Sequence, residues 1–183
     1  MKYFRLRDDV TIQGRWHLSD VVLATGVEPL LDAGKVVQEP GALSGTVSHP
    51  GRVLGFTLTS FNVPVVTSSV ADAVHGVAGS DVQCLPIEIA EQAGMMVLNA
   101  LRVVRCLDET RSEFIKWTSH DHRAELAGQY RQVTRLALAP GTVPADAHFF
   151  RVEGWLVALV VSEMVKEAME RVGCLGAKFV QLQ

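Results

Sequence analysis

The sequence of 183 residues has only three cysteines, Cys84, Cys106 and Cys174, and they lie far apart. It contains neither a CxxC pair nor a set of Cys and His residues at metal-ligand spacing, which argues against a disulfide framework and against a structural zinc site. We therefore expect three buried free thiols in a protein of the reducing cytoplasm.

Long apolar runs are also missing, because no run approaches the ~20 residues that a transmembrane helix needs. The first residues, MKYFRLRDDV, carry charges where a signal peptide has an apolar core. A formal net charge of −3 is mild and argues against non-specific nucleic-acid binding through a basic surface. The expectation is a cytoplasmic protein with no membrane partner and no nucleic-acid partner.

The motifs of common enzyme classes do not occur. There is no GxSxG, HExxH or GxGxxG motif, and the glycine-rich residues 45–51 lack the lysine and the final Ser or Thr of a phosphate loop. Apolar neighbours around Cys106 predict a buried structural thiol rather than a nucleophile paired with His120 or His122, because burial raises the pKa and suppresses the thiolate. We predict no catalytic residue, no metal site and no cofactor.

The clearest structural pattern lies in residues 149–183, which read as strand, helix and strand. Residues 155–161 form an apolar, β-branched run typical of a buried strand, and Ser162 follows at the N-cap position of a helix. Glu163 in the first turn and Arg171 in the last favour the helix dipole, and Gly173 ends the helix. The apolar stripe of this helix comprises Val165, Ala168, Met169 and Val172.

Residues 63–89 repeat this order, with Thr67 in the position of Ser162 and with Gly76 and Gly79 as helix-ending residues. The apolar stripe of this second helix comprises Val70, Ala73, Val74 and Val77. Placing the two caps over one another aligns similar apolar positions, which either an internal duplication or a chance match of common residues explains. The two units suggest two helices docked on a shared sheet.

Most other segments alternate like short strands, and turn-forming residues separate them. The expected strands fall at about 2–6, 14–18, 54–58, 97–105, 114–117 and 130–139, with turns or loops at 120–128 and 140–146. The turn-forming residues between 26 and 50 predict loops and short strands rather than helices. We predict an α+β fold in one domain, 1–183, with a mostly antiparallel multi-stranded sheet and at least two packed helices at about 67–77 and 162–172.

Two clusters of polar residues are candidate sites. His120 and His122, two apart, would face one side of a strand and could reach one metal ion, but no third or fourth ligand stands at a typical spacing, so a polar loop is the simpler interpretation. The densest acidic group, with an aromatic residue nearby, is either a partner-binding surface or a solvated turn. Its members are Asp108, Glu109, Glu113 and Trp117.

Several short motifs resemble a family of immunity proteins from bacterial polymorphic toxin systems, which is abundant in myxobacteria. The motifs occur in the family's order over nearly the whole chain, at residues 15–18, 81–86, 98–109, 111–113, 116–117, 150–151, 154–155, 160–166 and 176–179. The resemblance implies a non-enzymatic cytoplasmic protein that binds and neutralises a cognate toxin delivered by sister cells, a nuclease in the best-known case. It supplies no catalytic or metal-binding residue and no mapped toxin contact.

The leading hypothesis is therefore a toxin-neutralising protein that acts by occlusion, with an acidic patch at residues 108–113 steering a basic nuclease. One alternative is an enzyme-like domain that binds a metal or small ligand through His120 and His122. Another is a homo-oligomeric interaction module, such as a homodimer that pairs its edge strands.

Overall fold

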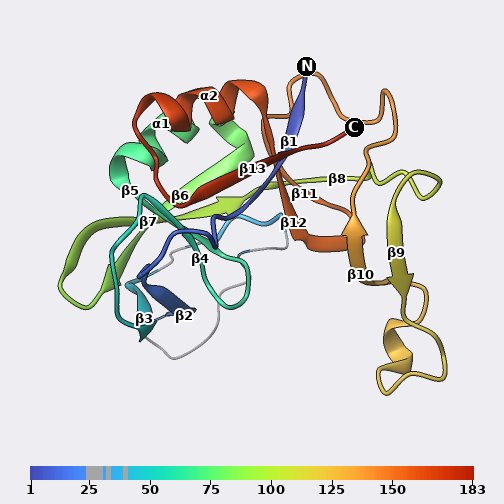
Figure 1. Ribbon diagram of the computed structural model, residues 1–183, viewed down its shortest axis with the longest axis horizontal. Coiled ribbons are helices and arrows are strands. Elements are labelled where there is room, and N and C mark those ends of the chain that lie inside the picture. The colour runs from blue at the N-terminus through green and yellow to red at the C-terminus, as the bar shows by residue number, and fades with distance from the viewer. Residues whose placement is uncertain (24–30, 32–33, 39–40) are drawn as a thin grey trace.

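The computed structural model describes residues 1–23, 31, 34–38 and 41–183, and this part contains three sheets and two α-helices (Figure 1). The five-stranded sheet has the order β13 (Ala177–Gln181), β1 (Tyr3–Asp8), β12 (Trp155–Ser162), β11 (Phe149–Val152) and β8 (Arg102–Val104). The six-stranded sheet has the order β2 (His17–Leu23), β3 (Leu43–His49), β6 (Val82–Ile89), β7 (Gln92–Ala100), β5 (Pro64–Thr67) and β4 (Phe56–Leu58). The third sheet is the hairpin of β9 (Glu113–Lys116) and β10 (Tyr130–Arg135).

The predicted α+β class is confirmed, with α1 (Ser68–Ala78) and α2 (Glu163–Arg171) at the expected places. Two short 3-10 turns, η1 (Gly79–Asp81) and η2 (Ala124–Leu126), complete the elements. Among the named strand pairs, only β3 with β6 and β8 with β11 are parallel. Part of the stretch 26–50, predicted as loops and short strands, lies outside the described residues, and its described part contains the short strand β3. No helix in the described part is long and apolar enough to cross a membrane.

The two helices pack against each other, but each contacts strands of a different sheet: α1 touches β5, β6 and β7, and α2 touches β1 and β12 (Figure 1). The expectation of one shared sheet is therefore wrong. A helical stripe shows that a face is buried but not which sheet buries it. One core still forms beneath both helices, with Val66 and Leu98 from the six-stranded sheet and Phe149 and Leu159 from the five-stranded sheet.

The strands around the two helices have the same topology. The orders β4-β5-β7-β6 and β11-β12-β1-β13 match strand for strand, and every neighbouring pair in both is antiparallel. In each unit the helix connects two parallel strands that flank one antiparallel strand. That middle strand is β7, which follows β6, in the first unit, but the N-terminal β1 in the second. This shared topology supports the duplication hypothesis.

The helix starts differ in how they are capped. The Ser162 hydroxyl accepts a hydrogen bond from the Val165 N–H at 3.3 Å, as predicted, and lies 3.0 Å from His148 Nδ1. Thr67 occupies the N-cap position of α1, but its hydroxyl lies 3.2 Å from the Ser69 hydroxyl and makes no cap bond. The predicted side-chain cap at Thr67 is therefore wrong.

The ends and faces of the helices also differ in detail from the prediction. Gly76 lies inside α1, which ends at Gly79 in a positive-φ conformation that favours glycine. The buried face of α1 comprises Val70, Ala71, Val74 and Ala78, so Ala73 was assigned to the core wrongly. In the second helix Val165, Ala168 and Met169 are buried as predicted, whereas Val172 is exposed beyond the last turn.

A buried carboxylate joins the two sheets. Asp81, 2% exposed, ends η1 and accepts hydrogen bonds from Arg102 Nε at 2.7 Å and from the His148 N–H at 2.7 Å. Its main-chain oxygen accepts from the Leu101 N–H, where β7 passes into β8. Arg102 also pairs with the exposed Asp146. Asp81 thereby fixes the start of β6 against β8 and the start of β11.

Replacing each N-cap residue tests whether its side chain stabilises the helix, as we expect for Ser162 but not for Thr67. We expect Ser162→Ala to lower the free energy of unfolding by about 1–2 kcal/mol, because it removes a bond to an otherwise free helix N–H. The matched change Thr67→Ala should cost no more than about 0.5 kcal/mol. Urea unfolding followed by circular dichroism measures both, and equal losses would contradict the assignment.

The two acidic partners of Arg102 provide a second matched pair. Asp81→Ala should destabilise the protein by about 3–5 kcal/mol, because it removes the buried partner of Arg102 and leaves the His148 N–H without its acceptor. Asp146→Ala removes an ion pair whose carboxylate side chain is 76% exposed, and it should cost less than about 1 kcal/mol. The same unfolding experiment checks this, and a loss at Asp146 as large as at Asp81 would count against the bridging role.

Candidate functional site

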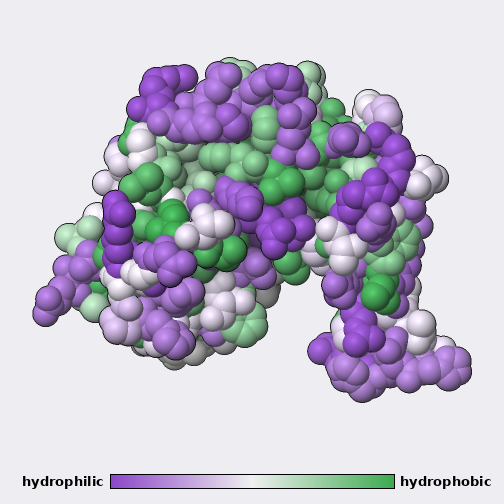
Figure 2. Space-filling view, viewed as in Figure 1, coloured by the Kyte–Doolittle hydropathy of each residue, from purple (hydrophilic) through white to green (hydrophobic). Residues whose placement is uncertain are grey.

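All four residues of the predicted partner-binding cluster lie on one projecting part of the molecule, residues 105–135, here called the arm. It contains β9, β10 and η2 and extends away from the helices (Figure 1). Figure 2 shows a hollow on this side of the molecule between the arm and the part that contains β2 and β3. The arm carries six basic and five acidic side chains, so it is not an acidic surface.

Asp108 organises the turn that leads into β9. Its carboxylate accepts from the Thr110 N–H at 2.9 Å, from the Thr110 hydroxyl at 2.6 Å and from Arg111 Nε at 2.7 Å. These hydrogen bonds from Thr110 and Arg111 lower the pKa of Asp108 to about 2. The carboxylate is thus ionised and fully engaged in shaping the turn.

Glu109 lies with the aromatic residues on one face of the hairpin. It accepts from Lys116 Nζ at 2.6 Å and from the Tyr130 hydroxyl at 2.6 Å, and these bonds hold its pKa below the usual range. Burial, together with the bond to Glu109, raises the pKa of Tyr130 to about 12. Phe114 packs edge-on against Tyr130, with ring centroids 5.2 Å apart, and the Lys116 ammonium lies over both rings. This face is therefore built for internal packing.

The opposite face of the hairpin, here called the outer face, comprises Glu113, Ile115, Trp117, Arg131 and Arg135. Residues two apart in a strand point the same way, which places the first three together. The Arg131 guanidinium lies 4.8 Å from the Trp117 ring centroid, and Arg135 Nε pairs with Glu113 at 3.0 Å. Between them Ile115 is 55% exposed. An exposed aliphatic residue beside tryptophan and arginine has the composition of an interface hot spot.

The structure thus divides the predicted cluster. Glu113 and Trp117 share the outer face, Glu109 belongs to the packed face, and Asp108 shapes the preceding turn. Sequence reasoning missed Ile115 and Arg131. The alternation of residues 113–117 could have identified Ile115, but Arg131 reaches Trp117 only because β10 pairs with β9.

His120 and His122 lie in a turn, not in a strand, so the argument that they face one side does not apply. His120 Nδ1 lies 3.4 Å from the Ser119 hydroxyl, whereas the His122 ring packs edge-on against Trp117 with centroids 5.3 Å apart. Across the described residues, no group of three or more His, Cys, Asp or Glu side chains could hold a metal ion.

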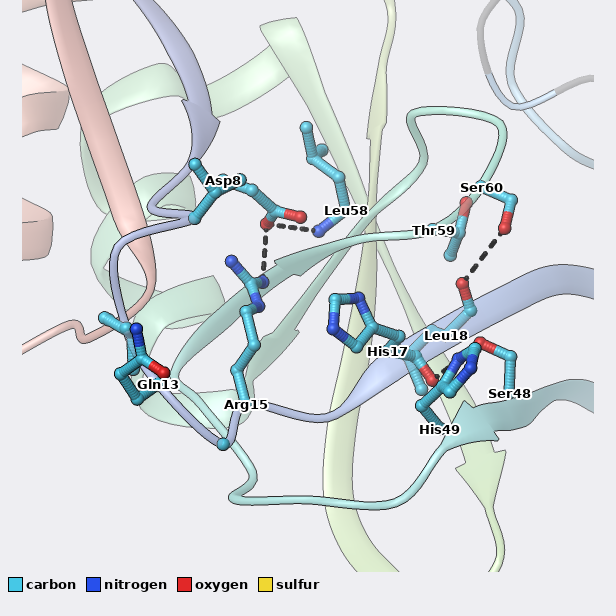
Figure 3. Close-up of a pocket in the computed structure, with 13 residues that line it drawn as sticks. Asp8, Gln13, Arg15, His17, Leu18, Ser48, His49, Leu58, Thr59 and Ser60 are labelled. Carbon is cyan, nitrogen blue, oxygen red and sulfur yellow. Dashed lines mark hydrogen bonds and ion pairs between the residues drawn. The ribbon is translucent and has the colours of Figure 1, made fainter.

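A cavity of about 740 Å³ brings together two histidines that are far apart in the sequence (Figure 3). His17 and His49 are opposite each other in the β2–β3 pair, with ring centroids 5.7 Å apart. The nearby Ser48 hydroxyl donates to the main-chain oxygen of His17 at 3.2 Å. At the other end, Asp8 pairs with Arg15 at 2.8 Å and accepts from the Leu58 N–H at 2.9 Å. These polar groups stabilise the junction of β1, β2 and β4 and do not form a nucleophile–base pair.

The three cysteines are free, but only Cys106 is buried, whereas Cys84 and Cys174 are half-buried. The prediction of three buried thiols is therefore correct for one. Burial raises the pKa of Cys106 to about 12 and that of Cys174 to about 12. Both thiols are protonated at neutral pH, which agrees with structural roles.

Residues 93–183 match the family model of an immunity protein family, Imm11. For that part of the chain, this confirms the resemblance to an immunity protein family. The matched segment contains most of β7, the whole arm, and the strands and helix from β8 to β13. No curated protein matches the chain.

Proposed function

We propose that this protein is an immunity protein that binds a cognate toxin and neutralises it by occlusion. The observation that carries the proposal is the Imm11 match over residues 93–183, which includes the arm. An exposed hairpin with an apolar centre is a suitable contact element, because hot spots combine buried aromatic or aliphatic anchors with arginine.

The outer face would form the centre of the toxin contact, with Ile115 and Trp117 as anchors. Glu113 and Arg135 would lie at the rim, where an ion pair contributes little affinity but helps to set the orientation. Stable interfaces bury on the order of 1,600 Å² in total. The contact would therefore extend from the arm to neighbouring parts of the molecule.

The resemblance to polymorphic toxin systems further suggests three details of the proposal. The toxin would be a nuclease, a sister cell would deliver it, and the protein would bind it in the cytoplasm. The charge distribution moves the proposed steering surface away from residues 108–113, whose acids are paired. No Lys or Arg occurs between Arg52 and Arg102, whereas Asp72, Glu88 and Glu91 in that stretch are exposed. This region of α1 and the β6–β7 hairpin would attract a basic nuclease.

The test is to express the protein with the toxin domain encoded beside its gene. The wild-type protein should restore growth and co-purify with that domain. Ile115→Glu and Trp117→Ala should each raise the Kd about 10- to 100-fold, because they remove anchors from the centre of the contact. Isothermal titration calorimetry measures the affinities, and circular dichroism checks that each variant is folded.

The matched control is Met164→Glu, which alters an exposed apolar residue on α2, away from the arm. It should leave the Kd unchanged within about twofold. A wild-type protein that neither restores growth nor co-purifies would refute the proposal for that toxin. Unchanged binding by both arm variants would refute the outer face as the contact.

A further inference from the structure

A cleft of about 490 Å³ lies between the five-stranded sheet and the base of the arm. Four of its lining residues are arginines, Arg5 and Arg7 from β1 and Arg111 and Arg135 from the arm, and no acidic side chain lines it. In Figure 2 hydrophilic side chains gather over β1 and over the base of the arm. The cleft therefore concentrates positive charge on a chain whose net charge is −3.

The two arginines from the arm already have acidic partners. Arg111 pairs with Asp108 at 2.7 Å, and Arg135 pairs with Glu113 at 3.0 Å. Both carboxylates lie outside the lining of the cleft. These pairs hold the two guanidinium groups in place at one wall.

The two arginines from β1 differ in this respect. Among the described residues, neither the Arg5 nor the Arg7 side chain has an acidic partner or a side-chain hydrogen bond. Arg5 Nε is buried and unsatisfied, and its guanidinium lies 4.5 Å from the centroid of the Trp155 ring. Burial and the neighbouring charge of Arg7 lower the pKa of Arg5 to about 10. A half-buried cation next to a like charge costs free energy, part of which an incoming anion would recover.

We propose that this cleft binds a carboxylate of the toxin, presented by an Asp or Glu side chain, with Arg5 and Arg7 as its recognition residues. Arginine suits this task, because its planar guanidinium donates two parallel hydrogen bonds to one carboxylate. The inference rests on the proposed function, and it adds a second, charge-reading contact next to the apolar outer face.

The position of the cleft and the overall charge favour a carboxylate on a protein over a nucleic-acid phosphate. Arg135 belongs to both the cleft and the outer face, so one partner can cover both. A polyphosphate chain would extend beyond so small a cleft, on a chain whose net charge is −3.

The first experiment uses the free protein, so it does not depend on any toxin. Succinate and inorganic phosphate are titrated separately at constant ionic strength, with chloride as the reference, while the thermal unfolding midpoint is followed. Succinate should raise the Tm of the wild-type protein by about 3 °C once it exceeds its Kd several-fold. Arg7→Glu should abolish this shift, and Arg171→Glu, the same charge change on an exposed residue of α2, should retain it.

The second experiment measures how tightly the protein binds the toxin domain encoded beside its gene. Arg7→Glu should raise the Kd for this toxin domain at least about tenfold relative to Arg171→Glu, mainly by faster dissociation. Arg7 is exposed, so the variant should fold, and circular dichroism checks this.

Each outcome decides the inference. No Tm response to succinate above the chloride reference, or an equal response in Arg7→Glu, overturns the cleft as an anion site. A response to phosphate without one to succinate overturns the carboxylate assignment. Equal toxin affinity of Arg7→Glu and Arg171→Glu overturns the toxin as the source of the carboxylate. If the wild-type protein binds no toxin while the succinate response is present, the proposed function fails and the anion site stands.

Discussion

The arrangement of the two sheets depends on the hydrogen bonds that the Asp81 carboxylate accepts from Arg102 and His148. This carboxylate is almost fully buried, yet it receives a guanidinium bond from β8 and an N–H bond at the start of β11. An unpaired buried carboxylate is costly, so the native state has to keep both partners in place. The helices α1 and α2 can then share one core although they follow strands of different sheets.

This framework leaves one part of the chain projecting. β8 and β11 are fixed at the junction, and the arm, residues 105–135, belongs to the chain between them. One face of the hairpin packs Phe114, Lys116 and Tyr130 together, which frees the outer face to present Ile115 and Trp117. A hairpin that packs on one face and has an exposed apolar centre on the other is suited to holding a partner.

Charge is distributed in three separate ways. The acids of the arm are paired, the arginines of β1 line a cleft without acidic partners, and the acids of α1 and the β6–β7 hairpin are exposed in a stretch without Lys or Arg. A mild net charge of −3 conceals this separation. A protein partner that contacts the apolar, cationic and anionic regions together would be bound with both affinity and specificity.

Patterns of neighbouring residues were enough to predict the local structure. Periodicity located both helices, the cap at Ser162 and most strands, because each of these depends on residues close together in the chain. Local patterns could not show that Glu109 and Glu113 are paired with basic side chains, that His17 contacts His49, or that four arginines line one cleft. The tertiary structure was needed for all three. Each of these contacts joins residues of different segments, and it depends on strand register, sheet order and the path of the turns, which local patterns do not specify.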